Sequence, residues 1–547
     1  MLESSFRNCF STKALKLAWE RVNASVGPDA KDYFGINVFS SNLDTNLIDF
    51  SEKILSNEFK PSRPFKYFQP KKAGTQRTKT VLKIHDALVF QAIGNHIAEL
   101  VYSDLKQAEQ SVFGSVLNAN VVKGVELIDE DPEDFYFFEY YVSLYNRFLE
   151  SINKTLKSNK ISHLLETDVT GFFDSIPHSV IIIELNKRGI ADEILELLAV
   201  CLNVWSGTRD FPTIGVGIPQ GPATSFLLAN LILDFLDKEI IKRDIPYYRF
   251  MDDIRVYGKS ESELNSHLVF IDRLLKGKSL NLNAQKTSIK KVTKKETEKE
   301  KLLDTSGITI ELTRNEEIET EILEQDATQL SQLNSEANHS NGYSKLYEHA
   351  LQLIELQLEK FTKTHAKISL EITPAESREF FTLSQKWRST VKILEENKEW
   401  HPDQSMIPIW LFGVRKFYWK ANIIACNLRY YKDLSLYYDL IISTFREFQS
   451  YEWVQYQILS GIGSATVFGK QFQLEILGSI PKTESPLVRL GYFLILIDSI
   501  KTDTKFFESI SELIKSEEND YVKESILNSI SYKHLNIPID VLKSWFL

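Results

Sequence analysis

The chain has 547 residues, of which 43% are hydrophobic and 25% charged, and its net charge is −10. At roughly 150 residues per domain, this length predicts about two to four domains with buried cores. No apolar run approaches the roughly 18 residues that cross a bilayer, which argues against a membrane protein. The N-terminal segment has an early acid and no long apolar core, so it does not resemble a signal peptide, and we expect a cytoplasmic protein with no membrane partner.

The cysteines and the net charge exclude further classes. Cys9, Cys201 and Cys426 are far apart and show no C-x-x-C spacing, which argues against a disulfide framework and against a structural zinc site. We expect them to be reduced and buried. The negative net charge argues against indiscriminate binding to nucleic acid, so any such binding requires a local basic surface.

One basic segment of this kind precedes the first long helix. It contains no acidic residue, and its cations are Lys60, Arg63, Lys66, Lys71, Lys72, Arg77, Lys79 and Lys83. Aromatic residues interleave with them, and Lys72-Ala73-Gly74 is typical of a turn. The pattern predicts a β-hairpin that lies against phosphates, with a solvated basic loop as the alternative.

The middle of the chain alternates helical and strand-like patterns. Residues 85–107 and 135–158 have the apolar spacing of helices. Residues 161–178 read as a short strand that ends in Asp168, followed by a turn and a new helix at Pro177-His178. A carboxylate at the end of a rigid strand is a common position for a functional side chain. Residues 211–221, FPTIGVGIPQG, form a glycine-rich loop that leads into an apolar helix.

Residues 249–257, RFMDDIRVY, place Asp252 and Asp253 inside an apolar, β-prone stretch. One interpretation is an ordinary turn, because aspartate is a common turn residue. The other is a strand–turn–strand hairpin whose tip presents carboxylates to a divalent metal ion.

The last part of the chain carries helical patterns almost throughout. Residues 331–344 are polar and read as a linker, whereas successive amphipathic segments follow from about residue 347 to the end. Amphipathic helices with short connections predict a helical-repeat array, although no exact repeat period is present.

Three motifs now stand in chain order: DVTGFFDSIPH, IPQG and YYRFMDD. Together they resemble the motifs of reverse transcriptases, and FQPKKAGTQRTKTVLKIHDALVFQAI and LNLNAQKT resemble further family segments. The resemblance covers roughly residues 60–290. It implies an α+β right-hand polymerase with fingers and palm, followed by an all-α helical-repeat domain. We expect an N-terminal extension and fingers at 1–118, the palm at 119–310, a linker at 311–345 and the helical domain at 346–547.

The chain also departs from the family pattern. Phe250 stands where the family usually has tyrosine, no F-L-G motif follows Lys286, and no thumb is recognisable. A palm joined to a helical domain most resembles the abortive-infection and related defence-associated reverse transcriptases of bacteria.

Nucleotidyl transfer explains why the chain would place carboxylates together. A hydroxyl attacks the α-phosphorus while pyrophosphate leaves, and two Mg²⁺ ions, with Mn²⁺ as a substitute, stabilise both oxygens through hard oxygen ligands. Asp168 and Asp252 are the expected bridging ligands and Asp253 a supporting carboxylate. The resemblance adds the backbone carbonyl of Val169.

The resemblance also implies residues that bind the incoming dNTP. Lys72 and Arg77 would contact the triphosphate, Phe173 would exclude a ribose 2′-hydroxyl, and Lys286 would assist the leaving pyrophosphate. Gln220 and Gly221 would pack against the nascent base pair. For Phe173 the alternative is an ordinary core aromatic.

Three functions remain open at the level of sequence. The first is a DNA polymerase of anti-phage defence, which the resemblance associates with homo-oligomers and with priming from a protein hydroxyl, sometimes without a template. Candidate priming residues are Tyr33, Tyr343, Tyr347, Tyr430, Tyr431, Tyr437 and Tyr438. The second is a reverse transcriptase that copies a partner noncoding RNA. The third is a catalytically silent scaffold that binds nucleic acid, which the paired carboxylates disfavour because they repel each other.

Overall fold

The computed structural model divides the chain into two compact units. The first contains Met1–Val26, Phe39–Lys66 and Thr78–Ile308, and the second contains Gly27–Val38, Tyr67–Arg77 and Thr309–Leu547. The described residues are 2–25, 35–129, 135–157, 161–292, 350–362, 374–395, 400–501, 504–531, 539 and 542–543. The expected linker at 311–345 lies outside them.

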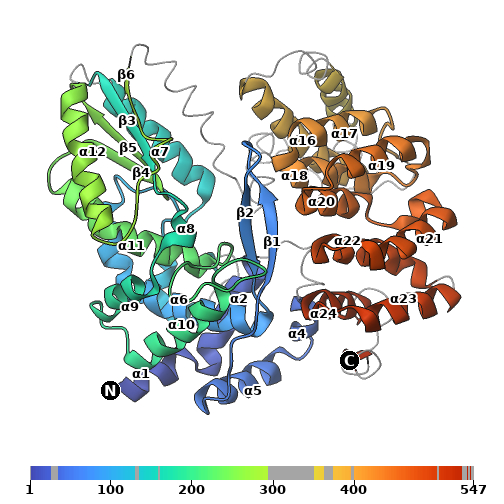
Figure 1. Ribbon diagram of the computed structural model, residues 1–547, viewed down its shortest axis with the longest axis horizontal. Helices are drawn as coiled ribbons and strands as arrows, with labels where there is room; N and C mark the ends of the chain where they lie inside the picture. Colours follow the sequence, from blue (N-terminus) through green and yellow to red (C-terminus); the bar gives the residue numbers. More distant parts are fainter. Residues whose placement is uncertain are drawn as a thin grey trace, which may run out of the picture. The chain divides into compact units, whose positions relative to one another are not determined.

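Most helices of the N-terminal part belong to the first unit (Figure 1), whereas the first three residues of α4 group with the second. Their bounds are α1 Leu2–Cys9, α2 Thr12–Ser25, α5 Leu43–Leu55 and α6 Ile84–Leu105, while the short α4 covers Ile36–Ser40. The helix expected at 85–107 is therefore confirmed as α6, whose buried residues lie around most of its circumference. Two short 3₁₀ segments, Lys106–Ala108 and Ala119–Asp129, follow it.

The basic segment forms the expected hairpin. Strand β1 covers Phe65–Pro70 and β2 covers Gln76–Val81, and the two make a separate two-stranded sheet. Gly74 in the turn has φ +84°, a conformation that glycine adopts without strain. The tip of the hairpin, Tyr67–Arg77, groups with the helices of the second unit, and its base belongs to the first.

A four-stranded antiparallel sheet lies at the centre of the first unit's later part. Its strands are β3 His163–Asp168, β4 Tyr247–Phe250, β5 Asp253–Gly258 and β6 Ser288–Lys291, in the order β4-β5-β3-β6. Figure 1 shows α7, Tyr141–Leu156, and α12, Glu261–Lys276, on opposite faces of these strands. Helix α7 begins later than the predicted 135–158, because Phe138 pairs in an isolated β-bridge with Leu117 instead.

The face of the sheet under α7 is rich in aromatic side chains. Phe148 of α7 contacts Phe250 of β4 at a ring-centroid distance of 5.6 Å, and Phe113 and Tyr257 belong to the same buried cluster. Such packing removes apolar area from water and holds the strands rigidly. Strand β4, which leads into Asp252 and Asp253, is therefore fixed on one side by a dense core.

The remaining helices of the first unit connect the strands. They are α8 Phe172–Ser175, α9 His178–Asn186, α10 Asp192–Trp205 and α11 Ala223–Ile241. Helix α11 is buried on nearly all sides, which explains its almost continuous apolar sequence. It approaches α6 closely at Gly94, where an added Cβ would lie 2.3 Å from the Thr224 hydroxyl oxygen.

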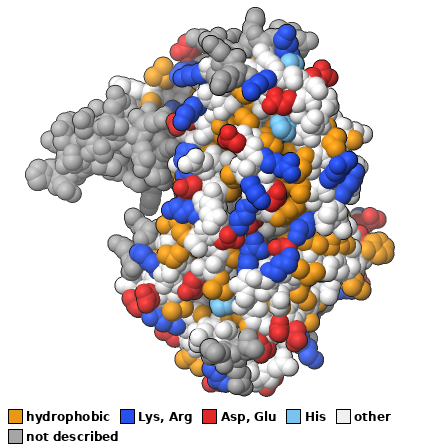
Figure 2. Space-filling model, turned by 90° about the vertical axis from the view of Figure 1, so that its left-hand side faces the viewer, with side chains coloured by type: hydrophobic (Ala, Val, Ile, Leu, Met, Phe, Trp, Pro, Cys, Tyr) orange, Lys and Arg blue, Asp and Glu red, His pale blue; other side chains and the backbone are white. Residues whose placement is uncertain are grey.

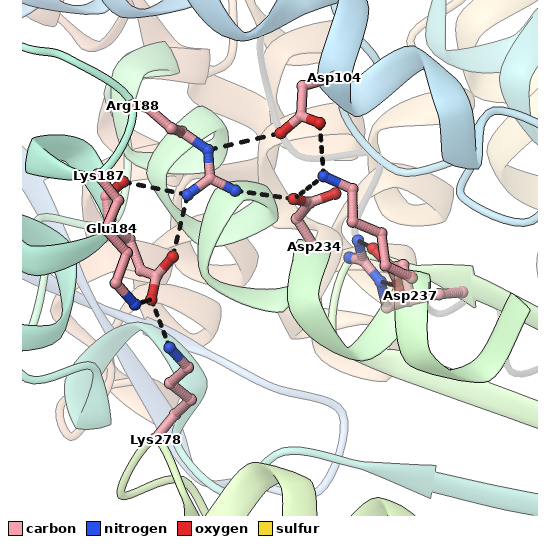
Figure 3. Close-up of polar contacts among 9 residues, drawn as sticks. Asp104, Glu184, Lys187, Arg188, Asp234, Asp237 and Lys278 are labelled. Atoms are coloured by element: carbon pink, nitrogen blue, oxygen red, sulfur yellow. Dashed lines mark hydrogen bonds and ion pairs between the residues drawn. The ribbon is translucent and has the colours of Figure 1, made fainter. Parts of the chain in front are cut away.

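A network of ion pairs joins α9, α11 and the end of α6 (Figure 3). Arg188 lies at its centre and contacts Asp234 at 2.8 Å, Glu184 at 3.0 Å and Asp104 at 3.6 Å. Burial would raise the pKa of Glu184, but hydrogen bonds from Lys278, Lys187 and Arg188 outweigh it and lower that pKa to about 2. Glu184 is therefore ionised at neutral pH, and the ion pairs of the network tie three elements together.

The second unit is helical apart from the hairpin tip, within the part of the chain that the structure describes. Residues 350–362 are helical. The longer helices that follow are α16 Pro374–Glu395, α17 Met406–Lys416, α18 Ala421–Ala425, α19 Tyr438–Glu447, α20 Glu452–Ile462, α21 Lys470–Ser479, α22 Pro486–Leu496, α23 Thr504–Ser516 and α24 Asp520–Ser529. Short 3₁₀ segments lie between them at Tyr418–Lys420, Cys426–Tyr430, Ser435–Tyr437, Ala465–Phe468, Ile480–Lys482 and Ile497–Lys501.

Buried tryptophans mark the core of this helical unit. Trp387, Trp410 and Trp453 are at most 2% exposed, and Phe361 contacts Trp410 at 4.9 Å between ring centroids. Figure 1 shows α20, α22 and α24 stacked one above another. A search of the described helices finds none that is both long enough and apolar enough to cross a membrane.

Candidate active site

Three carboxylates come together at one end of the four-stranded sheet. Asp168 closes β3 and stands directly opposite Asp253, the first residue of β5, in the antiparallel register. Asp253 also pairs with Phe250 of β4, so that Met251 and Asp252 form the two-residue turn between these strands. The predicted hairpin is confirmed, with Asp252 in its turn rather than on a strand.

The turn itself has a strained backbone. Met251 has φ +54°, a region that residues with a side chain rarely adopt. Gly114 lies directly behind it, since a Cβ there would be 2.4 Å from the backbone nitrogen of Met251. The Phe113 amide donates to the carbonyl of Arg249 at 2.9 Å, which extends the support along β4.

A fully buried arginine holds the other side of the turn. The Arg249 guanidinium donates to the Met251 carbonyl at 2.7 Å and to both carboxylate oxygens of Asp237 at 2.8 and 2.6 Å. It also donates to Asn230, while the Tyr247 hydroxyl donates to Asp237 at 2.7 Å. Because Asp237, Asn230 and Tyr247 are all buried and hydrogen-bonded, the network fixes the turn.

Sequence reasoning missed Gly114, Arg249 and Asp237, which position the turn without belonging to a motif. Arg249 is part of the YYRFMDD segment, so its place two residues before the turn was visible. The burial of Arg249 could not be seen in the sequence, because an arginine in a strand is usually exposed. Only the packing of α11 against β4 shows that its charge is paired inside the protein.

The electrostatics of the tip favour a bound cation. Burial, together with the charges of Asp168 and Asp253, raises the pKa of Asp252 from 3.8 to about 6. The pKa of Asp253 is also raised by burial, partly offset by Arg255. Groups that resist ionisation because of like-charged neighbours are stabilised when a cation neutralises them.

Lys286 lies against the first of these carboxylates. Its ammonium donates to Oδ2 of Asp168 in an ion pair, whereas Oδ1 of Asp168 is buried and has no hydrogen-bond partner. Val169 is buried and forms an isolated bridge with Leu282, the residue that precedes the turn containing Lys286. The predicted site residues Asp168, Val169 and Lys286 are thus neighbours.

The donors present fit a hard divalent cation. The orphaned oxygen of Asp168 and the mutual repulsion at Asp252 are both features that such an ion would relieve. In the described residues, no group of three or more His, Cys, Asp or Glu side chains already has the geometry of a metal site. A hard divalent cation such as Mg²⁺ would complete the site when it binds.

Three of the residues expected to contact the nucleotide, Phe173, Gln220 and Gly221, belong to the first unit. Phe173 of α8 is buried and contacts the ring of Phe226 at 5.2 Å between centroids. The Gln220 carbonyl accepts a hydrogen bond from the Thr80 amide at 2.9 Å. Gly221 has φ +153°, and a Cβ there would lie 2.6 Å from the Thr80 carbonyl oxygen, so only glycine fits this crossing.

A pocket of about 240 Å³ opens between the base of the hairpin and the glycine-rich loop. Its polar lining includes Lys66, Thr78, Asp174 and Gln220. Lys66 is only 4% exposed and donates to the Gly207 carbonyl at 2.6 Å. Burial lowers the pKa of Lys66 to about 8, partly offset by the charge of Asp174. Lys66 was one of many cations in the sequence and was not singled out.

Lys72 and Arg77 lie in the hairpin tip of the second unit. Lys72 is exposed in the turn and Arg77 is half-buried on β2. Their predicted role in binding the triphosphate stays a prediction.

The charges on the surface are mixed rather than uniformly basic on the face that Figure 2 shows. Lys and Arg side chains gather near the middle of that face, with Asp and Glu side chains among them. A net charge of −10 is consistent with this mixture. Attraction of nucleic acid to this face would therefore be strongly reduced by salt.

Comparison with known families now identifies the domain. Residues 70–310, less than half of the chain, match the family model described as "Reverse transcriptase (RNA-dependent DNA polymerase)". Residues 70–310 therefore contain a reverse transcriptase domain, a type of domain that indicates RNA-directed DNA polymerase activity. The three carboxylates at the tip of the sheet all lie inside the matched residues.

The solved structures that match are remote, and this chain spans less than two thirds of the length of the first two. A telomerase from Candida albicans in complex with a fragment of telomeric RNA has a TM-score of 0.32 and 12% identity, over 72% of this chain and 66% of that one. A telomerase from Candida tropicalis with telomeric RNA has a TM-score of 0.32 and 10% identity, over 83% and 64%. The apo form from Candida tropicalis has a TM-score of 0.30 and 10% identity, over 89% and 68%. No curated protein matches the chain.

Proposed function

We propose that this protein makes DNA from dNTPs by nucleotidyl transfer supported by two divalent ions. The observation that carries the proposal is the register that places Asp168 opposite Asp253, with Asp252 at the adjoining turn. Asp168 and Asp252 would hold both ions, Asp253 would support them, and the Val169 carbonyl would complete one shell. Bound Mg²⁺ would stabilise charge on the attacking and leaving oxygens.

The remaining predicted residues would bind the nucleotide. Lys72 and Arg77 would offset the charge of the triphosphate. Phe173 would exclude a 2′-hydroxyl by its bulk, and Gln220 and Gly221 would support the nascent base pair. Lys286, whose ammonium pairs with Asp168 in the absence of substrate, is well placed to assist the leaving pyrophosphate.

In this proposal the chain is a right-hand polymerase joined to a helical-repeat domain. Residues 1–118 form an N-terminal extension and the fingers, 119–310 the palm, 311–345 a linker and 346–547 the repeat domain. The succession of packed helices in the second unit supports the last assignment.

The biological role that we propose is anti-phage defence by abortive infection, in the cytoplasm and as a homo-oligomer. Its support is the combination of the polymerase motifs with a helical unit where a thumb would stand in sequence order. A strain that expresses the protein should resist phage, and Asp252→Asn should remove the resistance. If the variant protects as well as the wild type, DNA synthesis is not the basis of defence.

Priming from a protein hydroxyl and synthesis without a template belong to the same proposal. Two of the candidate tyrosines, Tyr430 and Tyr431, are at most 8% exposed, so they are poor attachment sites. Tyr437 and Tyr438 are half-buried, and the Tyr438 hydroxyl donates to Glu475 at 2.7 Å. Tyr33, Tyr343 and Tyr347 lie outside the described residues and remain candidates.

The decisive experiment supplies Mg²⁺ and labelled dNTPs without primer or template. The products are separated on a denaturing protein gel with and without protease. Label that migrates with the protein and is released by protease supports protein priming. Label that appears only when RNA and primer are supplied supports templated synthesis and contradicts the template-free route.

A second candidate function is copying of a partner noncoding RNA. The description of the matched family as an RNA-dependent DNA polymerase favours it. Sequencing the product distinguishes the two, because a templated product is a defined complement and a template-free product has a biased composition. A catalytically silent scaffold is the third alternative, and any incorporation that depends on Asp252 would rule it out.

A further inference from the structure

The turn of the basic hairpin is packed against the helical unit. Residues Tyr67–Arg77 belong to the same compact unit as α20 and its neighbours. The turn carries Lys72, one of the two cations assigned to the triphosphate. Three side chains, from two separate places in the helical sequence, contact the backbone of the hairpin tip Tyr67–Arg77.

The first of these contacts is made by a buried carboxylate. Glu452, at the start of α20, is 9% exposed and accepts a hydrogen bond from the Phe68 amide of β1 at 3.0 Å. Its other oxygen accepts from the Ser485 hydroxyl at 2.5 Å, just before α22. Hydrogen bonds to an ionised acceptor are stronger than neutral ones, so Glu452 ties the hairpin to two helices.

Two tyrosine hydroxyls make the other contacts. Tyr418 donates to the carbonyls of Lys71 at 3.4 Å and Lys72 at 3.2 Å, and Tyr451 donates to the carbonyl of Gly74 at 3.4 Å. The two rings pack on each other with centroids 5.2 Å apart. Burial, followed by the neighbouring Tyr451, raises the pKa of Tyr418, which keeps its hydroxyl a donor. We call Glu452, Tyr418 and Tyr451 the turn clamp.

The clamp acts on the backbone and leaves the cation available. These hydrogen bonds to the hairpin involve its main-chain atoms, whereas the side chain of Lys72 is exposed. A two-stranded hairpin is marginally stable by itself, so external contacts decide how often its turn adopts one conformation. Ligand affinity falls in proportion to the fraction of molecules in the competent conformation.

We propose that the turn clamp lets the helical unit set how tightly Lys72 and Arg77 bind the triphosphate of a dNTP. The clamp residues are positioning residues that touch no substrate. The inference rests on the proposed triphosphate role of the hairpin, and it gives the helical unit a function in nucleotide binding.

The test compares the double variant Tyr418→Phe/Tyr451→Phe with the wild type. Both changes keep the rings and remove only the hydroxyls. We expect the dissociation constant for dTTP, measured by equilibrium binding with Mg²⁺, to rise about threefold to thirtyfold. Amide hydrogen exchange across residues 67–77 should accelerate in the same variant.

The matched control is Tyr492→Phe in α22, which removes a hydroxyl from the same unit that bonds to Thr483. It should leave both the dTTP affinity and the exchange of residues 67–77 unchanged. An equal effect of control and double variant would mean a general loss of stability and would overturn the clamp.

Lys72→Ala separates this inference from the proposal beneath it. If Lys72→Ala weakens dTTP binding and the tyrosine variant does not, the clamp is wrong and the triphosphate site stands. If Lys72→Ala has no effect, the triphosphate assignment fails and the clamp's role in binding fails with it. If both weaken binding, adding the tyrosine changes to Lys72→Ala should weaken it less than expected for independent sites.

Discussion

Asp252 shows how a single residue can combine a folding cost with a chemical purpose. Its pKa is raised because burial and two carboxylates oppose its ionisation. A chain selected only for stability would avoid this arrangement, which a divalent cation relieves.

Replacing Asp252 with Asn should abolish DNA synthesis, because the amide cannot bridge two cations as a carboxylate does. We expect incorporation of labelled dNTP to fall by at least about a thousandfold, with an unchanged circular dichroism spectrum. The control is Asp129→Asn, which should retain activity. The Asp129 side chain is 74% exposed and forms a surface ion pair with Lys13. Near-normal synthesis by Asp252→Asn would refute the metal assignment.

The same substitution should change the pH dependence of stability in EDTA. The folded pKa of Asp252, about 6, exceeds the ordinary 3.8, so between these values the folded state binds the proton more tightly than the unfolded state. Stability of the wild type should therefore fall as pH rises through this window, by about 1–3 kcal/mol. Asp252→Asn should be more stable at pH 7 and lose this advantage below about pH 4. Urea titrations of both proteins at several pH values measure the difference in their stability. Parallel profiles of stability against pH would contradict the prediction.

Phe173→Ala should admit ribonucleotides, because removing the ring opens space beside the sugar. Phe173 is buried, so the change should also cost about 3–5 kcal/mol of stability. The ratio of kcat/KM for rNTP and dNTP is independent of the fraction folded and should rise. Phe172→Ala truncates the adjacent buried ring and should leave the ratio alone. Equal ratios in both variants would make Phe173 an ordinary core aromatic.

At the scale of elements, the β4–β5 turn depends on the segment behind it. Gly114→Ala would bring a Cβ to 2.4 Å from the Met251 nitrogen, so the turn or the segment must move. We expect a loss of about 1–3 kcal/mol in stability and a larger proportional loss in kcat, because the carboxylates shift with the turn.

The control for Gly114→Ala is Gly478→Ala in α21, where nothing lies within 4 Å of the added Cβ. It should be neutral or slightly stabilising, by up to about 1 kcal/mol, because alanine is the better helix former. Full activity of Gly114→Ala would show that the turn does not need its close support.

At the scale of the whole molecule, the two units have separate cores and the carboxylates belong to only one of them. We expect calorimetry to resolve two unfolding transitions, of which Mg²⁺ added without nucleotide raises the one that reports the first unit. Asp252→Asn should remove that shift. A single transition, or an equal shift of both, would show that the units unfold together.

The sequence by itself determined the elements that carry the chemistry. The period of the apolar residues predicted α6, and the apolar run after the glycine-rich loop predicted α11. The strand ending at Asp168 and the DD hairpin followed from local pattern. These features depend on neighbours a few residues away, so a linear chain reveals them. The start of α7 could not be predicted in this way, because a bridge between Leu117 and Phe138 competes with the helix.

Only the tertiary structure decided what holds these elements in place. The burial of Arg249 beside Asp237, the fit of Gly114 behind Met251 and the packing of Glu452 on the basic hairpin join residues remote in sequence. Such contacts depend on how elements pack in three dimensions, and no local spacing encodes them. The carboxylates were therefore visible in the sequence, whereas the residues that position them were not.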